Sequence, residues 1–160
     1  QYLSSLLAQI PGILPMRRRK DITQASYFNF TFRLDWSVLQ AAKGVTNNHF
    51  SAALQKELNA DFQAPYEPLN ACSLYKPHTK PRHHLNAEYW KKIDPTRFKL
   101  PVAEDAHNKS GVAVHHKFIM GSKKDMDDIA TAVKKIVKHL DELKAEGPKA
   151  ERKRYRALAI

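Results

Sequence analysis

Alternation of hydrophobic and polar residues predicts a β-strand between positions 26 and 34. Phe28, Phe30, Phe32 and Leu34 would share one face of this strand, and the intervening residues are polar or amphipathic. Aromatic residues at every second position are typical of an antiparallel strand with one buried face. We therefore expect all four of these side chains to contribute to the hydrophobic core.

A second strand is predicted over residues 112–119. Val112 and Val114 alternate with smaller or polar residues, and His115 and His116 follow directly. Because neighbouring side chains of a strand point to opposite faces, the two histidine rings are expected to point apart. Gly121 and Ser122 mark the end of this strand.

Hydrophobic residues at helical spacing predict helices on either side of these strands. An opening helix is expected to stop at Pro11 and Gly12, and further helices are expected over 47–59 and 123–145, with Thr46 and Ser122 as their N-caps. Shorter helices are predicted over 84–93 and 101–109, the first with its apolar residues turned inward (Leu85, Tyr89 and Trp90). This order predicts an α+β fold in which helices cover one face of a small, mostly antiparallel sheet.

The stretch 61–82 interrupts the pattern, because it contains four prolines that exclude long regular elements. Tyr66 and Tyr75 lie within it and can anchor an ordered loop. Long ordered loops tend to carry function, so this segment is the first place to seek binding residues.

Composition adds a strong basic bias. The 160 residues include 27 Lys and Arg against 16 Asp and Glu, which gives a formal net charge of +11. Such an excess suggests nucleic acid or acidic ligands as partners. Part of it lies in the basic run 17–20, interpreted as a solvated loop, and part in a basic tail at 146–160 that follows a domain at 1–145.

Known motifs of self-contained active sites are not found in the sequence. Cys72 is the single cysteine, and no His-Glu-x-x-His pair or glycine-rich phosphate loop occurs, so no metal ligands are assigned. No apolar run approaches the roughly 18 residues that cross a bilayer. The first residue is Gln1, inside an expected helix, which suggests a piece of a longer protein.

Several segments, taken in order, resemble the C-terminal small domain of the DegT–DnrJ–StrS family of sugar aminotransferases. They are residues 6–13, Ser-Tyr-Phe-Asn-Phe-Thr-Phe-Arg-Leu-Asp at 26–35, 50–57, Pro-Tyr-Glu-Pro-Leu-Asn at 65–70, Leu-Pro-Val-Ala-Glu at 100–104, Val-His-His-Lys-Phe-Ile-Met-Gly at 114–121, and 126–129. The similarity covers about residues 1–145 and is strongest to the branch that aminates cyclitol ketones or makes aminohydroxybenzoate.

The resemblance implies a fold-type I enzyme that uses pyridoxal phosphate (PLP), is dimeric and cytoplasmic, and takes a keto-sugar or cyclitol ketone with an amino-acid donor. The family's Schiff-base lysine belongs to a large N-terminal domain, so no catalytic or cofactor-binding residue is assigned to this chain, which alone is expected to be inactive. Candidate substrate contacts carried over from the family are Tyr66, Tyr75, His78, His115 and His116.

Two alternatives remain open on the sequence alone. The chain could be a stand-alone basic module that binds nucleic acid or an acidic protein. Its aromatic strand face, however, is interpreted as part of the hydrophobic core rather than as a surface on which bases stack. It could also be a degenerate small domain that is kept for dimer contacts. Binding of nucleic acid is not expected under the aminotransferase interpretation.

Overall fold

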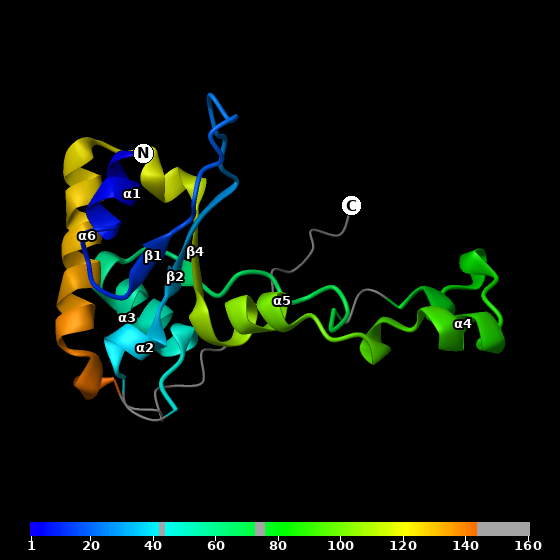
Figure 1. The fold of residues 1–160 in the computed structure, drawn as a ribbon. Helices are drawn as coiled ribbons and strands as arrows, with labels where there is room; N and C mark the ends of the chain where they lie inside the picture. Colours follow the sequence, from blue (N-terminus) through cyan, green and yellow to red (C-terminus); the bar gives the residue numbers. More distant parts are fainter. Residues whose placement is uncertain (42–43, 73–75, 144–160) are drawn as a thin grey trace.

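A four-stranded antiparallel sheet forms the centre of the molecule, in a computed structural model that describes residues 1–41, 44–72 and 76–143 (Figure 1). The strands are β1 (Ile13–Pro15), β2 (Asn29–Leu34), β3 (Phe62–Gln63) and β4 (Gly111–His115), and their order across the sheet is β1-β2-β4-β3. Phe30 of β2 and Phe62 of β3 both lie opposite Val114 of β4. The sheet thus joins segments that are distant in the sequence, as the predicted α+β class requires.

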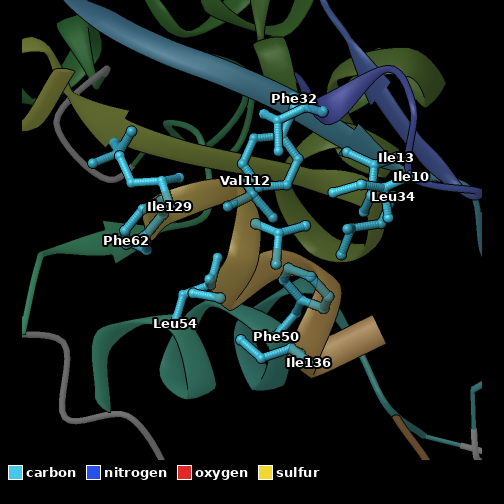
Figure 2. Close-up of a cluster of buried hydrophobic side chains, with 14 of the residues drawn as sticks. Ile10, Ile13, Phe32, Leu34, Phe50, Leu54, Phe62, Val112, Ile129 and Ile136 are labelled. Atoms are coloured by element: carbon cyan, nitrogen blue, oxygen red, sulfur yellow. The ribbon is translucent and has the colours of Figure 1, made fainter. Parts of the chain in front are cut away.

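Helices cover one face of this sheet and close the core. They are α1 (Tyr2–Leu7), α3 (Asn47–Leu58) and α6 (Lys123–Lys138), with the short α2 (Trp36–Leu39) at the edge. Figure 2 shows the layer in which side chains from α3 and α6 meet the strands; its labelled members include Phe32, Phe50, Leu54, Val112 and Ile136. Burial of this layer supplies the main driving force for folding.

Helix caps were predicted correctly, but one helix end was not. Ser122 and Asp125 form a reciprocal capping box at the start of α6, as the sequence indicated. The helix ends at Lys138 rather than at 145, because His139 leaves helical geometry and a 3-10 turn, η6 (Leu140–Glu142), places Leu140 in the core. The predicted end of this helix at residue 145 lies outside the described residues, as does the predicted tail at 146–160.

The aromatic strand is shorter than its alternation suggested. Phe28 lies before β2 and is 65% exposed, so its assignment to the core was wrong, whereas Phe30, Phe32 and Leu34 are buried. Strands β1 and β3 were not predicted, since two or three residues cannot display a period. The opening helix also ends early, and Gly12 takes a left-handed conformation in the turn that leads into β1.

Between β3 and β4 the chain leaves the body and returns, and we call residues 66–100 the arm. It contains two proline-initiated 3-10 turns, η1 (Pro77–Thr79) and η2 (Pro81–His83), followed by α4 (Ala87–Ile93) and η3 (Pro95–Arg97). The return runs through α5 (Pro101–Asp105) and a π-helical turn, η4 (Ala106–Ser110). Figure 1 shows the arm, in green, extending away from the sheet and its helices.

The position of α4 corrects one prediction. Its apolar residues were expected to point inward to the sheet, but the helix lies out on the arm and Tyr89 is 51% exposed. Trp90 is partly buried, against His78 of the arm itself. Periodicity identified the helix but could not show which surface its apolar residues contact.

Candidate functional site

The predicted site residues fall into two separate places. His115 and His116 lie at the end of β4 on the body, whereas His78 lies on the arm beside Trp90 of α4. Tyr66 stands where the arm leaves the body and is 75% exposed. Tyr75 lies outside the described residues. The structure therefore does not bring the predicted residues together into one pocket.

His115 and His116 do not point apart as predicted. The strand ends at His115, and His116 begins a 3-10 turn, η5 (His116–Ile119). The backbone N–H of His116 still donates to the carbonyl of Phe28, the residue before β2, but the chain enters the 3-10 turn at this point and leaves the sheet, so the alternation of side chains stops. The ring centroids of the two histidines are consequently 4.2 Å apart.

Neighbouring groups fix the hydrogen-bonding character of each ring. The Nδ1 of His115 accepts a hydrogen bond from the backbone N–H of Lys117, at 3.3 Å. The Nδ1 of His116 lies 3.1 Å from the carbonyl oxygen of Phe28, which can only accept, so this nitrogen must carry the proton. In the neutral rings, therefore, Nε2 of His115 is a donor and Nε2 of His116 is an acceptor.

Electrostatics keep His115 neutral. Partial burial lowers its pKa below the ordinary value of 6.5, and the neighbouring His116 and Lys117 lower it further. The Phe28 ring stands edge-on to the His115 ring, with centroids 5.2 Å apart, and contributes to this burial. A ring nitrogen that donates beside a ring nitrogen that accepts is the pattern that a hydroxyl group, itself both donor and acceptor, can satisfy twice.

A hollow of about 390 Å³ on the arm forms the second candidate location. Its polar lining includes Asn70, Lys76, His78, Asp94 and Thr96, with Trp90 and Cys72 beside them. The rings of His78 and Trp90 are stacked with centroids 3.8 Å apart. Hydrogen bonds from the side chain and backbone of Thr96 lower the pKa of Asp94, and the hollow is lined by this carboxyl group and by Lys76.

The sequence reading missed Phe28, Trp90 and Asp94 as site components. Phe28 was assigned to the core by its strand period and Trp90 by its helical period. Asp94 could have been found from Asp-Pro-Thr at 94–96, in which an aspartate precedes a turn that its side chain caps. Phe28 had no comparable signal, because its place depends on where β4 ends.

Neither a metal cluster nor a membrane span appears in the part of the chain that the structure describes. Within residues 1–41, 44–72 and 76–143, no three His, Cys, Asp or Glu side chains are grouped so as to hold a metal ion. Over the same ranges, no helix combines the length and apolar character needed to cross a membrane.

Comparison with known proteins gives a consistent group of relatives. The chain is 34% identical over 137 residues to the L-glutamine:2-deoxy-scyllo-inosose aminotransferase of Streptomyces fradiae, which covers 86% of this chain and 31% of that protein. It is 30% identical over 142 residues to the L-glutamine:scyllo-inosose aminotransferase of Streptomyces griseus, covering 89% and 32% respectively. The chain thus spans about a third of the length of these relatives. No family model matches it.

A solved structure supports the same grouping at the level of the fold. The crystal structure of 3-amino-5-hydroxybenzoic acid synthase superimposes with a TM-score of 0.54 at 18% identity, over 86% of this chain and 32% of that one. Sequence and fold agree over the same share of the chain. Together these similarities support an aminotransferase domain of the DegT–DnrJ–StrS type.

Proposed function

We propose that this chain is the C-terminal portion of a PLP-dependent aminotransferase that transfers the amino group of glutamine to a cyclitol ketone. In this proposal the enzyme is a cytoplasmic homodimer, and the portion described here contributes contacts on the substrate side and closes over the cofactor. The observation that carries the proposal is the 34% identity, sustained over 86% of the chain, to an enzyme named for both of these substrates.

The residues of this portion do not by themselves fit PLP. A Schiff-base lysine needs an enclosed position, but every lysine that the structure describes is exposed, including Lys76 beside the hollow of the arm. We therefore derive no catalytic step from this chain. In the whole enzyme PLP supplies the electron sink for amino transfer, and its anchoring lysine belongs to the proposed large domain.

We assign the histidine pair to the ring of the cyclitol ketone. A cyclitol presents hydroxyl groups, and each hydroxyl can accept from Nε2 of His115 while it donates to Nε2 of His116. The lowered pKa of His115 supports this role, because a protonated ring would bind a carboxylate rather than a neutral alcohol. Tyr66 and His78 remain proposed contacts from the arm, and Tyr75 is proposed on the sequence alone.

Kinetics of the full-length enzyme test this assignment. Replacement His115→Phe keeps the ring against Phe28 but removes the donor, and His116→Phe removes the acceptor. Loss of one hydrogen bond worth about 1 kcal/mol should raise the KM for the ketone roughly five- to tenfold. The KM for glutamine should stay constant, because the pair contacts the ketone.

A matched control is available at the other end of the domain. His139 is exposed and pairs with Glu142 at 2.7 Å, so His139→Phe should leave both KM values unchanged. An unchanged ketone KM in both His115→Phe and His116→Phe would remove the pair from the substrate site. Absence of amino transfer from glutamine to any cyclitol ketone by the unmodified enzyme would overturn the proposed function itself.

A further inference from the structure

The base of the arm is held firmly against the body. The Nδ2 of Asn47, on α3, donates to the carbonyls of Gly111 at 2.7 Å and His107 at 3.0 Å. Where the arm leaves the body, the ring Nδ1 of His107 donates to the carbonyl of Pro65 at 2.7 Å. These bonds join the segment that enters the arm to the segment that leaves it, and they tie the second of these to α3. The direction in which the arm projects is therefore set by the body.

Beyond this base the arm lacks a core of its own. None of the residues of η1, η2, α4 or η3 is buried. Among the described residues, seven of the fifteen exposed large apolar side chains lie at 66–102. Helix α4 has seven residues, fewer than the roughly 12–15 at which an isolated helix becomes even marginally stable. A second surface is needed to stabilise it.

One face of α4 is the centre of this unpartnered surface. Tyr89 and Ile93 are four residues apart, so they lie on the same side of the helix, and they are 51% and 36% exposed. Trp90, on another side, stacks on His78 within the arm. Leu69 and Phe98 of the same arm are 73% and 54% exposed. Several large apolar side chains exposed on one segment indicate an interaction site.

Charge identifies the kind of surface that fits. The arm has seven lysines and arginines against three acidic residues, and Lys91 and Lys92 lie on α4 itself. The remainder of the chain is also basic, with 20 lysines and arginines against 13 acidic residues. A second copy of this chain would bring two surfaces of like net charge together, so charge complementarity favours an acidic surface outside this chain.

We propose that the arm docks, through the Tyr89–Ile93 face of α4 together with Leu69 and Phe98, onto an apolar surface with an acidic rim on the large domain of the same enzyme. The large domain corresponds to the two-thirds of the relatives' length that this chain does not span. The inference rests on the proposed function, since it takes its partner from the whole aminotransferase. The arm then fixes the small domain against the large one while the base sets the angle between them.

Amide hydrogen exchange tests the docking directly. The exchange of α4 (Ala87–Ile93) is measured in this 160-residue chain and in the full-length enzyme, with α6, whose apolar face is buried in the core, as internal reference. In the full-length enzyme the α4 amides should exchange at least tenfold more slowly than in the chain alone, whereas the α6 amides should change little. Raising the salt concentration should reduce the protection of α4, because the acidic rim is screened.

Variants separate the docking surface from general stability. The double replacement Tyr89→Ser with Ile93→Ser should remove the protection of α4 in the full-length enzyme. Val38 is 50% exposed on α2 of the body, so Val38→Ser is the matched control and should leave that protection unchanged. Should the double variant fold poorly, Lys91→Glu with Lys92→Glu keeps the apolar face and should still reduce the protection at low salt.

The outcomes distinguish this inference from the proposed function. An enzyme that transfers amino groups, but whose α4 amides exchange as fast as in the isolated chain, overturns the docking alone. A full-length protein without amino transfer whose α4 is protected overturns the function and leaves the docking supported. Concentration-dependent dimerisation of the 160-residue chain that disappears in the double serine variant would assign the surface to a second copy and overturn the proposed partner.

Discussion

Two adjacent histidines show how the backbone around a residue determines its chemistry. His115 and His116 are equivalent in the sequence, yet one Nδ1 receives a hydrogen bond from a backbone N–H and the other donates to a backbone carbonyl. Their outer nitrogens therefore have opposite hydrogen-bonding character. Such a pair suits a neutral hydroxyl better than an ion, which is why we assign it to the cyclitol ring rather than to a donor carboxylate.

The titration of His115 is the first residue-scale prediction. Its pKa should lie below 6.5, first because of partial burial and then because of the charges of His116 and Lys117. Lys117→Gln removes one like charge and should move the pKa upward. An NMR titration of the imidazole protons measures both, and Lys109→Gln on η4 serves as the control. A His115 pKa at or above 6.5 in the unmodified protein would contradict the environment described here.

The lowered pKa of His115 also predicts how this residue affects the free energy of unfolding. As pH falls, the unfolded chain binds a proton at this ring before the folded chain does. The contribution of His115 to the free energy of unfolding is therefore fully present above pH 6.5 and is lost as pH falls through the folded-state pKa. In Lys117→Gln the loss should be smaller and should be complete at a higher pH, because the folded-state pKa lies closer to 6.5.

At the scale of elements, several side-chain hydrogen bonds hold the segment through which the arm returns into β4. The indole N–H of Trp36 donates to the carbonyl of Lys109 at 2.8 Å, and Asn47 donates to the carbonyls of His107 and Gly111 on either side of it. Gly111 is required there, because a Cβ would lie 2.4 Å from the carbonyl of Ala106. The π-helical turn η4 thus connects three elements rather than ending as a regular helix.

Replacement Asn47→Ala is the element-scale prediction. It leaves buried carbonyls of η4 and β4 without their donor, so the free energy of unfolding should fall by roughly 1–3 kcal/mol. Urea unfolding followed by tryptophan fluorescence measures the change. Asn48 is exposed on the same turn of α3, so Asn48→Ala should change stability by less than about 0.5 kcal/mol. Equal effects of the two replacements would show that the buried hydrogen bonds contribute little.

At the scale of the whole molecule, the basic charge has a more specific interpretation than a nucleic-acid footprint. The run 17–20 is exposed, as predicted, and Arg19 pairs with Asp21 at 2.6 Å. Other lysines of the body form ion pairs with acidic residues, for example Lys135 with Glu57 at 2.7 Å. On the arm, exposed apolar side chains such as Tyr89 and Ile93 flank the basic residues Lys91 and Lys92, and this coincidence favours a protein partner.

The whole-molecule prediction concerns the chain by itself. Because every described lysine is exposed, the 160-residue chain mixed with PLP should develop no stable enzyme-type imine absorbance and should transfer no amino group from glutamine. Absorbance spectroscopy and a chromatographic assay of the amino product measure the two properties. Glutamine-dependent amination by this chain alone would contradict the assignment of the anchoring lysine to another domain. Tight, steeply salt-dependent binding of nucleic acid would instead favour the alternative basic module.

The sequence by itself determined the long elements and the family resemblance. These features follow from local signals, each of which depends on residues within one or two turns of the chain. The signals are the strand and helix periods, Ser122 and Asp125 at a helix start, and the prolines that begin short turns. They predicted the α+β class, the main core residues and the helix on the arm. The order of segments also indicated the aminotransferase relationship that the comparisons confirm.

Tertiary structure alone decided where those elements face. The period of 26–34 continues through Phe28, but β4 ends at His115 and the chain turns into η5 after its last hydrogen bond to Phe28, so the side chain of Phe28 stays exposed. The same ending turns His116 toward its neighbour. Likewise, apolar residues on α4 have the same spacing whether they meet a core or an absent partner. Long-range contacts made these choices, and a local pattern contains no information about which surface lies opposite.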